Sequence, residues 1–181
     1  MDINLGYQDA KMQKQIYSVL EKEKIVQLQQ FFSNDLRLLK RKIEKMQTKK
    51  VNDILFCKYL YVVPDDYTKK ELRPCIDFIE KITKQKIKKI QIILAKHTDY
   101  SVINDKQKAE NGYDAILDMN EAWDTSWGGL LYYRYGDKEK KEVPCMYNSL
   151  VIVKKEKTRN YLKYINHYAQ EKRTLLLFKT K

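Results

Sequence analysis

The sequence predicts an α+β fold in which N-terminal helices back an antiparallel β-barrel or jelly roll. The first observation is that apolar residues recur every three or four positions through most of the N-terminal half. The second is a series of short strand-like segments, separated by turn signals, that runs from residue 87 almost to the C-terminus. Helices first and many short strands afterwards are typical of helix-backed antiparallel barrels.

Three helices are expected. The first covers residues 9–32, and the second follows a turn at residues 33–35, where Asp35 is a natural N-cap. In the second helix the apolar positions are spaced by three and four, and the opposite face is basic: Arg37, Arg41, Lys42, Lys45, Lys49 and Lys50. The third helix spans residues 68–84, with Pro74 in its first turns, where proline is tolerated.

The expected strands are rich in aromatic and β-branched residues. The first spans residues 54–63 and stops at Pro64. The others, separated by turn signals such as Asn111-Gly112 and Gly136-Asp137, span residues 90–95, 113–119, 129–135, 149–154, 161–165 and 174–178.

Length and composition fit one compact domain. The chain has 181 residues, 43% of them hydrophobic, with five glycines and three prolines, which excludes collagen-like, low-complexity and disordered classes. We therefore predict a single domain over residues 1–181, with helical support at 1–50 and the barrel core at 51–181.

The sequence also predicts a cytoplasmic protein. No apolar run approaches the roughly 20 residues needed to span a bilayer, and the N-terminal residues show no secretory signal. The cysteines are far apart and odd in number, which argues against a disulfide framework and against a structural zinc site: Cys57, Cys75 and Cys145.

The net charge of the chain does not identify its binding partner. Lysine and arginine number 36 against 24 acidic residues, a net charge of +12. Such a chain could bind nucleic acid through its second helix or its lysines between residues 81 and 96. A solvated basic surface on a lysine-rich protein explains the same counts.

His97-Thr98-Asp99 is the first candidate site. In an extended segment, residues two apart point to the same side, so His97 and Asp99 are expected to project together. An imidazole and a carboxylate form two-thirds of the His/His/carboxylate triad that binds Fe(II) in oxygenases. A surface ion pair at a strand end explains the same two residues.

Three later segments place this pair in a wider pattern. Residues 123–131 read WDTSWGGLL, Pro144 and NSLVIV at 148–153 follow, and the chain closes with RTLLLF at 173–178. This order, over residues 50–178, resembles the Fe(II)/2-oxoglutarate-dependent oxygenases, in particular their prolyl-4-hydroxylase-like branch. The resemblance implies a double-stranded β-helix, a jelly-roll or cupin-like barrel.

The resemblance also implies cofactors and an activity. Fe(II) would be held by His97, Asp99 and a third ligand, and the far carboxylate of 2-oxoglutarate would bind Arg173. A tyrosine near the barrel mouth could hydrogen-bond 2-oxoglutarate, Tyr100 first and otherwise Tyr59 or Tyr61. The implied activity is that of a dioxygenase that hydroxylates a protein or peptide side chain, proline being the familiar target.

The third metal ligand has two candidates. The alignment of residues 148–153 with the family puts Asn160 where the second histidine belongs. His167 follows seven residues later, six residues before Arg173. We favour His167, because an amide oxygen binds Fe(II) less strongly than an imidazole. If neither serves, the chain is an oxygenase-fold barrel that has lost its metal and binds a partner. A further alternative, suggested by the basic residues, is an oxygenase or binding module that acts on nucleic acid.

Overall fold

The computed structural model describes residues 1–53, 57–102, 108–136 and 139–180. Its centre is a single antiparallel sheet in the order β2-β3-β4-β10-β6-β9-β7-β8, with β1 paired to β9 and β5 to β3. The strands are β1 (Ile25–Leu28), β2 (Lys49–Asp53), β3 (Cys57–Val62), β4 (Ile87–Ala95), β5 (Tyr100–Ser101), β6 (Glu110–Asp118), β7 (Leu131–Tyr135), β8 (Glu139–Glu142), β9 (Leu150–Leu162) and β10 (Arg173–Thr180).

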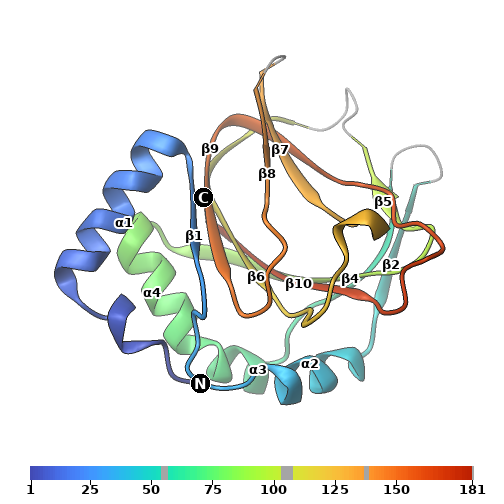
Figure 1. The fold of residues 1–181 in the computed structure, drawn as a ribbon, viewed down its shortest axis with the longest axis horizontal. Helices are drawn as coiled ribbons and strands as arrows, with labels where there is room; N and C mark the ends of the chain where they lie inside the picture. The colour runs from blue at the N-terminus through green and yellow to red at the C-terminus, as the bar shows by residue number, and fades with distance from the viewer. Residues whose placement is uncertain (54–56, 103–107, 137–138, 181) are drawn as a thin grey trace.

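The sheet curls into a barrel, and helices cover it along one side and its lower edge in the view of Figure 1. The helices are α1 (Ala10–Glu23), α2 (Arg37–Glu44), α3 (Asp66–Glu71) and α4 (Arg73–Thr83), with short 3-10 turns η1 (Leu5–Tyr7) and η2 (Thr125–Trp127). The predicted α+β class with a jelly-roll barrel is confirmed.

Strand β10 contributes side chains to two hydrophobic cores, one beneath the helices and one inside the barrel. Leu176 and Phe178 pack toward the helices, in a core that includes Leu20 and Ile79. The alternate residue Leu175 faces the barrel interior, because successive side chains of a strand point to opposite faces. The side chains that line the barrel interior are therefore set by strand parity.

The first two helices are shorter than predicted. α1 ends at Glu23 because Lys24 adopts a left-handed conformation, with φ 61°, and the β-branched residues that follow form β1. β1 pairs with β9, with Ile25 opposite Val153. The segment at 1–50 is thus joined to the barrel by strand pairing, and its separation from residues 51–181 stays a prediction.

Other boundaries also differ. The predicted helix at 68–84 is two helices that meet at Leu72, with Pro74 at the start of the second. The strands predicted at 149–154 and 161–165 are one strand, β9, whose first part pairs with β6 and whose last part pairs with β7. Of the strand predicted at 54–63, residues 57–62 form β3, and residues 54–56 lie outside the described part.

Candidate functional site

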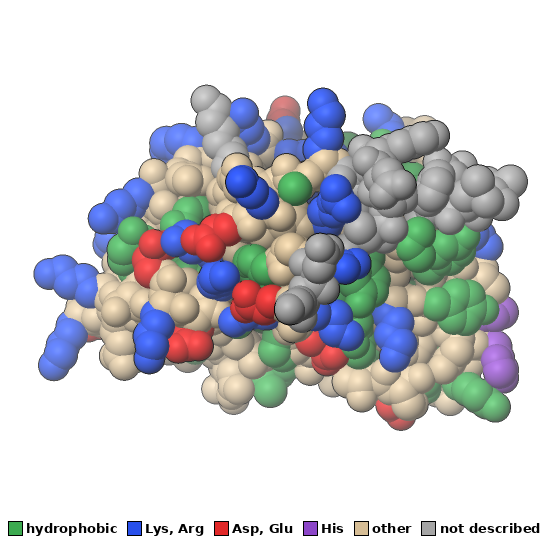
Figure 2. Space-filling view, turned by 90° about the horizontal axis from the view of Figure 1, so that it is seen from above, with side chains coloured by type: hydrophobic (Ala, Val, Ile, Leu, Met, Phe, Trp, Pro, Cys, Tyr) green, Lys and Arg blue, Asp and Glu red, His purple; other side chains and the backbone are tan. Residues whose placement is uncertain are grey.

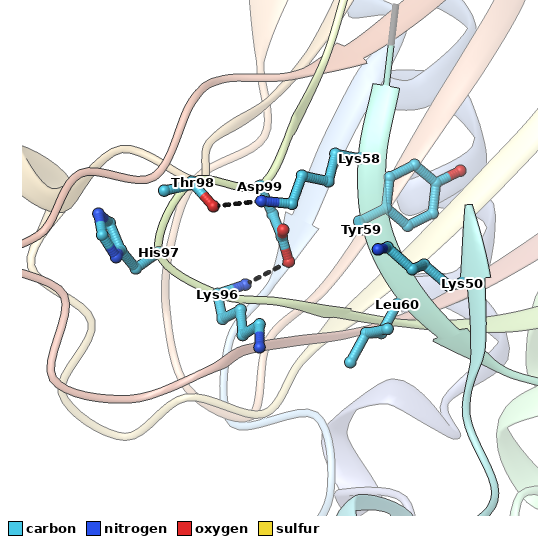
Figure 3. A pocket seen from close by; sticks show the side chains of 8 residues that line it. All are labelled: Lys50, Lys58, Tyr59, Leu60, Lys96, His97, Thr98 and Asp99. Carbon is cyan, nitrogen blue, oxygen red and sulfur yellow. Dashed lines mark hydrogen bonds between the residues drawn. The ribbon is translucent and has the colours of Figure 1, made fainter. Parts of the chain in front are cut away.

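The segment after β4 is a tight turn and not the extended segment assumed from the sequence. Thr98 has φ 71°, in the left-handed region, and the Asp99 amide donates to the Lys96 carbonyl at 2.8 Å. The turn reverses the direction of successive side chains. His97 is exposed, whereas Asp99 is only 2% exposed, and Figure 3 shows the imidazole pointing away from the carboxylate.

The Asp99 carboxylate is surrounded by lysines. Its Oδ2 accepts the Lys96 backbone N–H at 2.9 Å. Burial raises the pKa of Asp99, and the hydrogen bond from Lys96 and the charges of Lys58, Lys96 and Lys50 offset part of that rise. The net shift is upward, so this buried carboxylate holds its proton more readily than an ordinary aspartate.

The two histidines lie beside each other on the surface. Their ring centroids are 6.4 Å apart in an edge-on arrangement, and both side chains are exposed, as the purple groups at one edge of Figure 2 show. The structure thus brings His97 and His167 together but leaves Asp99 on the other side of the turn. Among the described residues, no three side chains of the His, Cys, Asp or Glu type are grouped so as to hold a metal ion.

Asn160 belongs to a different environment. It lies in β9 opposite Tyr133 of β7, and its side chain hydrogen-bonds the Tyr133 phenol. That phenol donates to Asp114 Oδ2 at 2.8 Å, and Asp114 pairs with Lys155 at 2.6 Å. Asn160 is therefore tied to a buried polar cluster inside the barrel.

Arg173, the predicted ligand of the 2-oxoglutarate carboxylate, already has a carboxylate partner within the chain. The residue is 1% exposed, and its guanidinium donates to both oxygens of Asp118, at 2.6 and 2.7 Å. Asn120 and Cys145 complete its surroundings, and the Trp123 ring centroid lies 5.2 Å away. This two-pronged pair is the geometry in which an arginine would grip a bound carboxylate.

Asp118 is the residue that the sequence analysis missed. Besides Arg173, its oxygens accept the backbone N–H groups of Asn120 and Met146, each at 3.0 Å. The sequence carries a signal for Asp118. A carboxylate at an inward position of an apolar strand predicts a buried partner, because buried charges are rarely left unpaired.

Trp123 packs against the barrel core and against Arg173. Its ring meets that of Trp127 edge to face at 5.3 Å, and its indole N–H donates to the Gly128 carbonyl at 2.9 Å. Both tryptophans are half-buried, and only Trp123 joins the core.

Comparisons with solved structures give the fold a family context. A prolyl-4-hydroxylase from Pseudomonas putida superposes with a TM-score of 0.70 at 15% identity, covering 94% of this chain and 99% of that one. A 2OG-Fe(II) oxygenase family oxidoreductase from Burkholderia pseudomallei gives 0.67 at 11% identity, over 92% and 89% of the two chains. A prolyl hydroxylase from Trichoplax adhaerens, solved with a hypoxia inducible factor peptide fragment, gives 0.68 at 10% identity, over 94% and 89%.

The chain has the fold of the 2OG-Fe(II) oxygenases. No protein-family model and no curated protein sequence matches it. The likeness therefore lies in the course of the backbone, and the chemistry has to be argued from the side chains of this chain.

The described side chains do not fit the two cofactors of the oxygenase fold in this arrangement. Fe(II) needs three converging donors, but the Asp99 carboxylate and the two imidazoles face different directions. A 2-oxoglutarate carboxylate needs a free guanidinium, but Asp118 fills both prongs of Arg173. Binding of either cofactor would require the turn at 96–99 or the Arg173 pair to rearrange.

What the turn does border is a pocket of about 490 Å³, here called the lysine pocket. Its lining combines three lysines, one carboxylate, two polar and two largely apolar side chains: Lys50, Lys58, Lys96, Asp99, His97, Thr98, Tyr59 and Leu60.

Of the three tyrosines predicted near 2-oxoglutarate, only Tyr59 lines this pocket, and burial raises the pKa of Tyr59. Tyr100 lies in β5, with its ring 6.5 Å from Tyr164. Tyr61 lies in β3, half-buried.

The predicted basic helix face is partly neutralised. Arg37 pairs with Asp35, and Lys42 pairs with Glu71 at 2.9 Å. Lys40, which is not part of the predicted face, pairs with Glu171 at 2.6 Å. Lys49 and Lys50, expected on the same face, belong to β2. In the described residues, the helices are all too short or too polar to cross a membrane.

Proposed function

We propose that this chain is a binding protein built on the oxygenase fold and that its barrel does not carry out Fe(II)- and 2-oxoglutarate-dependent oxidation. The observation that carries the proposal is the separation of the candidate ligands. The Asp99 carboxylate faces lysines, while both imidazoles lie on the outer surface. The pairing of Arg173 with Asp118 adds support, because it occupies both terminal nitrogens of the guanidinium from within the chain and leaves only the buried Nε without a partner.

The binding site we propose is the lysine pocket. It is the concave region into which the turn at 96–99 directs Asp99, and it carries an excess of positive charge. A cytoplasmic location is part of the proposal, supported by three cysteines that are all free thiols.

The second candidate is the activity implied by the resemblance, a dioxygenase that hydroxylates a protein or peptide side chain such as proline. The adjacency of His97 and His167 favours it, since a turn that brought Asp99 toward them would complete three donors. The peptide bound to the Trichoplax prolyl hydroxylase makes a peptide the natural substrate to test.

An anaerobic titration separates the two candidates. Fe(II) and 2-oxoglutarate are added to the protein without oxygen, and the visible spectrum is recorded. The same mixture is then exposed to air and assayed for succinate. We expect no charge-transfer band and no succinate above a protein-free control.

A band together with succinate would overturn the binding proposal and establish the dioxygenase. In that case His167→Ala and Asn160→Ala identify the third ligand, because only the true ligand abolishes the band. A nucleic-acid role has weaker support, since Lys40 and Lys42 of α2 are paired with glutamates.

A further inference from the structure

We infer that the lysine pocket binds a small phosphomonoester, with its phosphate held by Lys50, Lys58 and Lys96. The inference rests on the proposed binding function and names the class of ligand. The three lysines come from separate parts of the sheet: β2, β3 and the turn after β4. Pairing of Lys50 with Leu60 and of Leu60 with Leu94 sets these strands side by side, so the fold itself gathers the ammonium groups.

These ammonium groups lack carboxylate partners. Among the side chains that the structure describes, which do not include those of residues 52–56, none of the three comes within 4.0 Å of a carboxylate oxygen, whereas Lys40, Lys154 and Lys155 all do. Asp99 is the one acid among the described lining residues, and it offsets a single charge. Three lysines against one carboxylate leave an excess of two positive charges. A phosphomonoester carries about −1.5 to −2 at neutral pH and balances that excess, whereas a monocarboxylate does not.

Thr98 supplies a further donor. Its Oγ1 accepts the Lys58 ammonium at 2.6 Å, which leaves the hydroxyl proton available for an anion. The left-handed backbone at this β-branched residue is strained, and such conformations recur at ligand clamps. Hydrogen bonds hold the turn: Thr98 N–H donates to Ile165 O, and Ile165 N–H to Asp99 O, each at 3.0 Å.

The shape favours a small ligand over a polymer. Tyr59 and Leu60 form a largely apolar wall within a volume of about 490 Å³, which suits a sugar-sized body beside the phosphate. The adjoining hollow, which shares Lys96 and His97, also contains two lysines and two glutamates: Lys40, Lys172, Glu44 and Glu171. Beyond the shared Lys96 these charges balance, so the excess positive charge does not extend along a path that a long polyanion would follow.

The test is calorimetric titration of the full chain with ribose 5-phosphate and with inorganic phosphate. Succinate and a single-stranded RNA without terminal phosphates serve as comparison ligands. We expect saturable binding of both phosphates and weaker binding of succinate and RNA. Lys58→Gln should weaken phosphate binding about tenfold, because it removes a charge-assisted bond to the ligand. Lys88→Gln, an equal charge change at an exposed β4 position, should leave affinity within about twofold.

Two further variants keep the result interpretable. Lys96→Gln changes an exposed side chain and should also weaken phosphate binding. It serves as the test if Lys58→Gln fails to fold. Asp99→Asn should tighten phosphate binding, because it removes a like charge from the pocket. Equal effects of Lys58→Gln and Lys88→Gln, tighter binding of RNA, or no binding of either phosphate would each overturn the inference. The Fe(II) and 2-oxoglutarate titration is scored separately, so its outcome decides the proposed function whether or not phosphate binds.

Discussion

At the residue scale, Asp118 determines whether Arg173 can bind the carboxylate of 2-oxoglutarate, because it already pairs with that guanidinium. Both are buried, and two short hydrogen bonds join the Asp118 oxygens to the two terminal nitrogens of the Arg173 guanidinium. Removal of one partner leaves an uncompensated charge in the barrel, so Arg173→Met should lower the free energy of unfolding by about 3–5 kcal/mol. Urea denaturation measures this. Arg41→Met, at an exposed helix position, is the matched control and should stay within about 0.5 kcal/mol.

Similar losses in the two variants would mean that the Arg173 pair contributes no more than a surface charge. Arg173 shares the inward parity of Leu175 and Leu177, and this parity is readable from the sequence of the strand. The partner of Arg173 could not be predicted, because Asp118 meets Arg173 only through the pairing of β6 with β10.

The relative orientation of His97 and Asp99 could not be predicted from the sequence. His97 and Asp99 are two residues apart, and the expectation that they project together depended on an extended backbone. One left-handed residue, Thr98, reverses that relation. A threonine gives no sequence signal for this conformation, which glycine or asparagine would give.

At the element scale, the turn into β7 depends on Gly128. Its φ is 82° with ψ −144°, and a Cβ atom there would lie 1.9 Å from the Tyr164 carbonyl oxygen. Gly128→Ala should therefore destabilise the protein by more than about 2 kcal/mol, through backbone strain and a backbone clash. Gly136→Ala is the control: φ is 58°, but nothing lies within 4 Å of its Cβ position.

Gly136→Ala should cost about 1 kcal/mol, from the left-handed conformation alone. Thermal denaturation of both variants measures the difference. Equal melting temperatures would show that the backbone near Tyr164 moves to make room for the added methyl group. The close approach to Gly128 would then contribute nothing to the difference in stability.

Elements that depend on local pattern were predicted, and elements that depend on a distant partner were missed. Core-facing strands such as β4 and β10 stand out by their apolar runs. β1 follows α1 directly, and its strand conformation comes from pairing with β9, which lies more than a hundred residues away. The charged strand β8, with sequence EKKE, has no apolar alternation to reveal it.

At the scale of the whole molecule, acid should destabilise the fold. The Lys154 hydrogen bond lowers the pKa of Glu21, and that of Lys86 lowers the pKa of Glu80. The Tyr147 hydrogen bond and then Arg37 bring the pKa of Asp35 from 3.8 to about 2. Because these carboxyls bind protons more weakly when folded, the stability they contribute is present above their ordinary pKa values and is lost as the pH falls through the folded ones.

The urea midpoint should therefore fall steadily between about pH 4.5 and about pH 2. Asp99 acts in the other direction, because its raised pKa makes the folded state bind a proton more readily. Asp99→Asn should accordingly stabilise the protein at pH 7 and change stability least at low pH, where the native aspartate is already neutral. A midpoint that stays constant to pH 2 in the wild type would contradict the carboxylate account. A variant equally stabilised at every pH would contradict the assignment to Asp99.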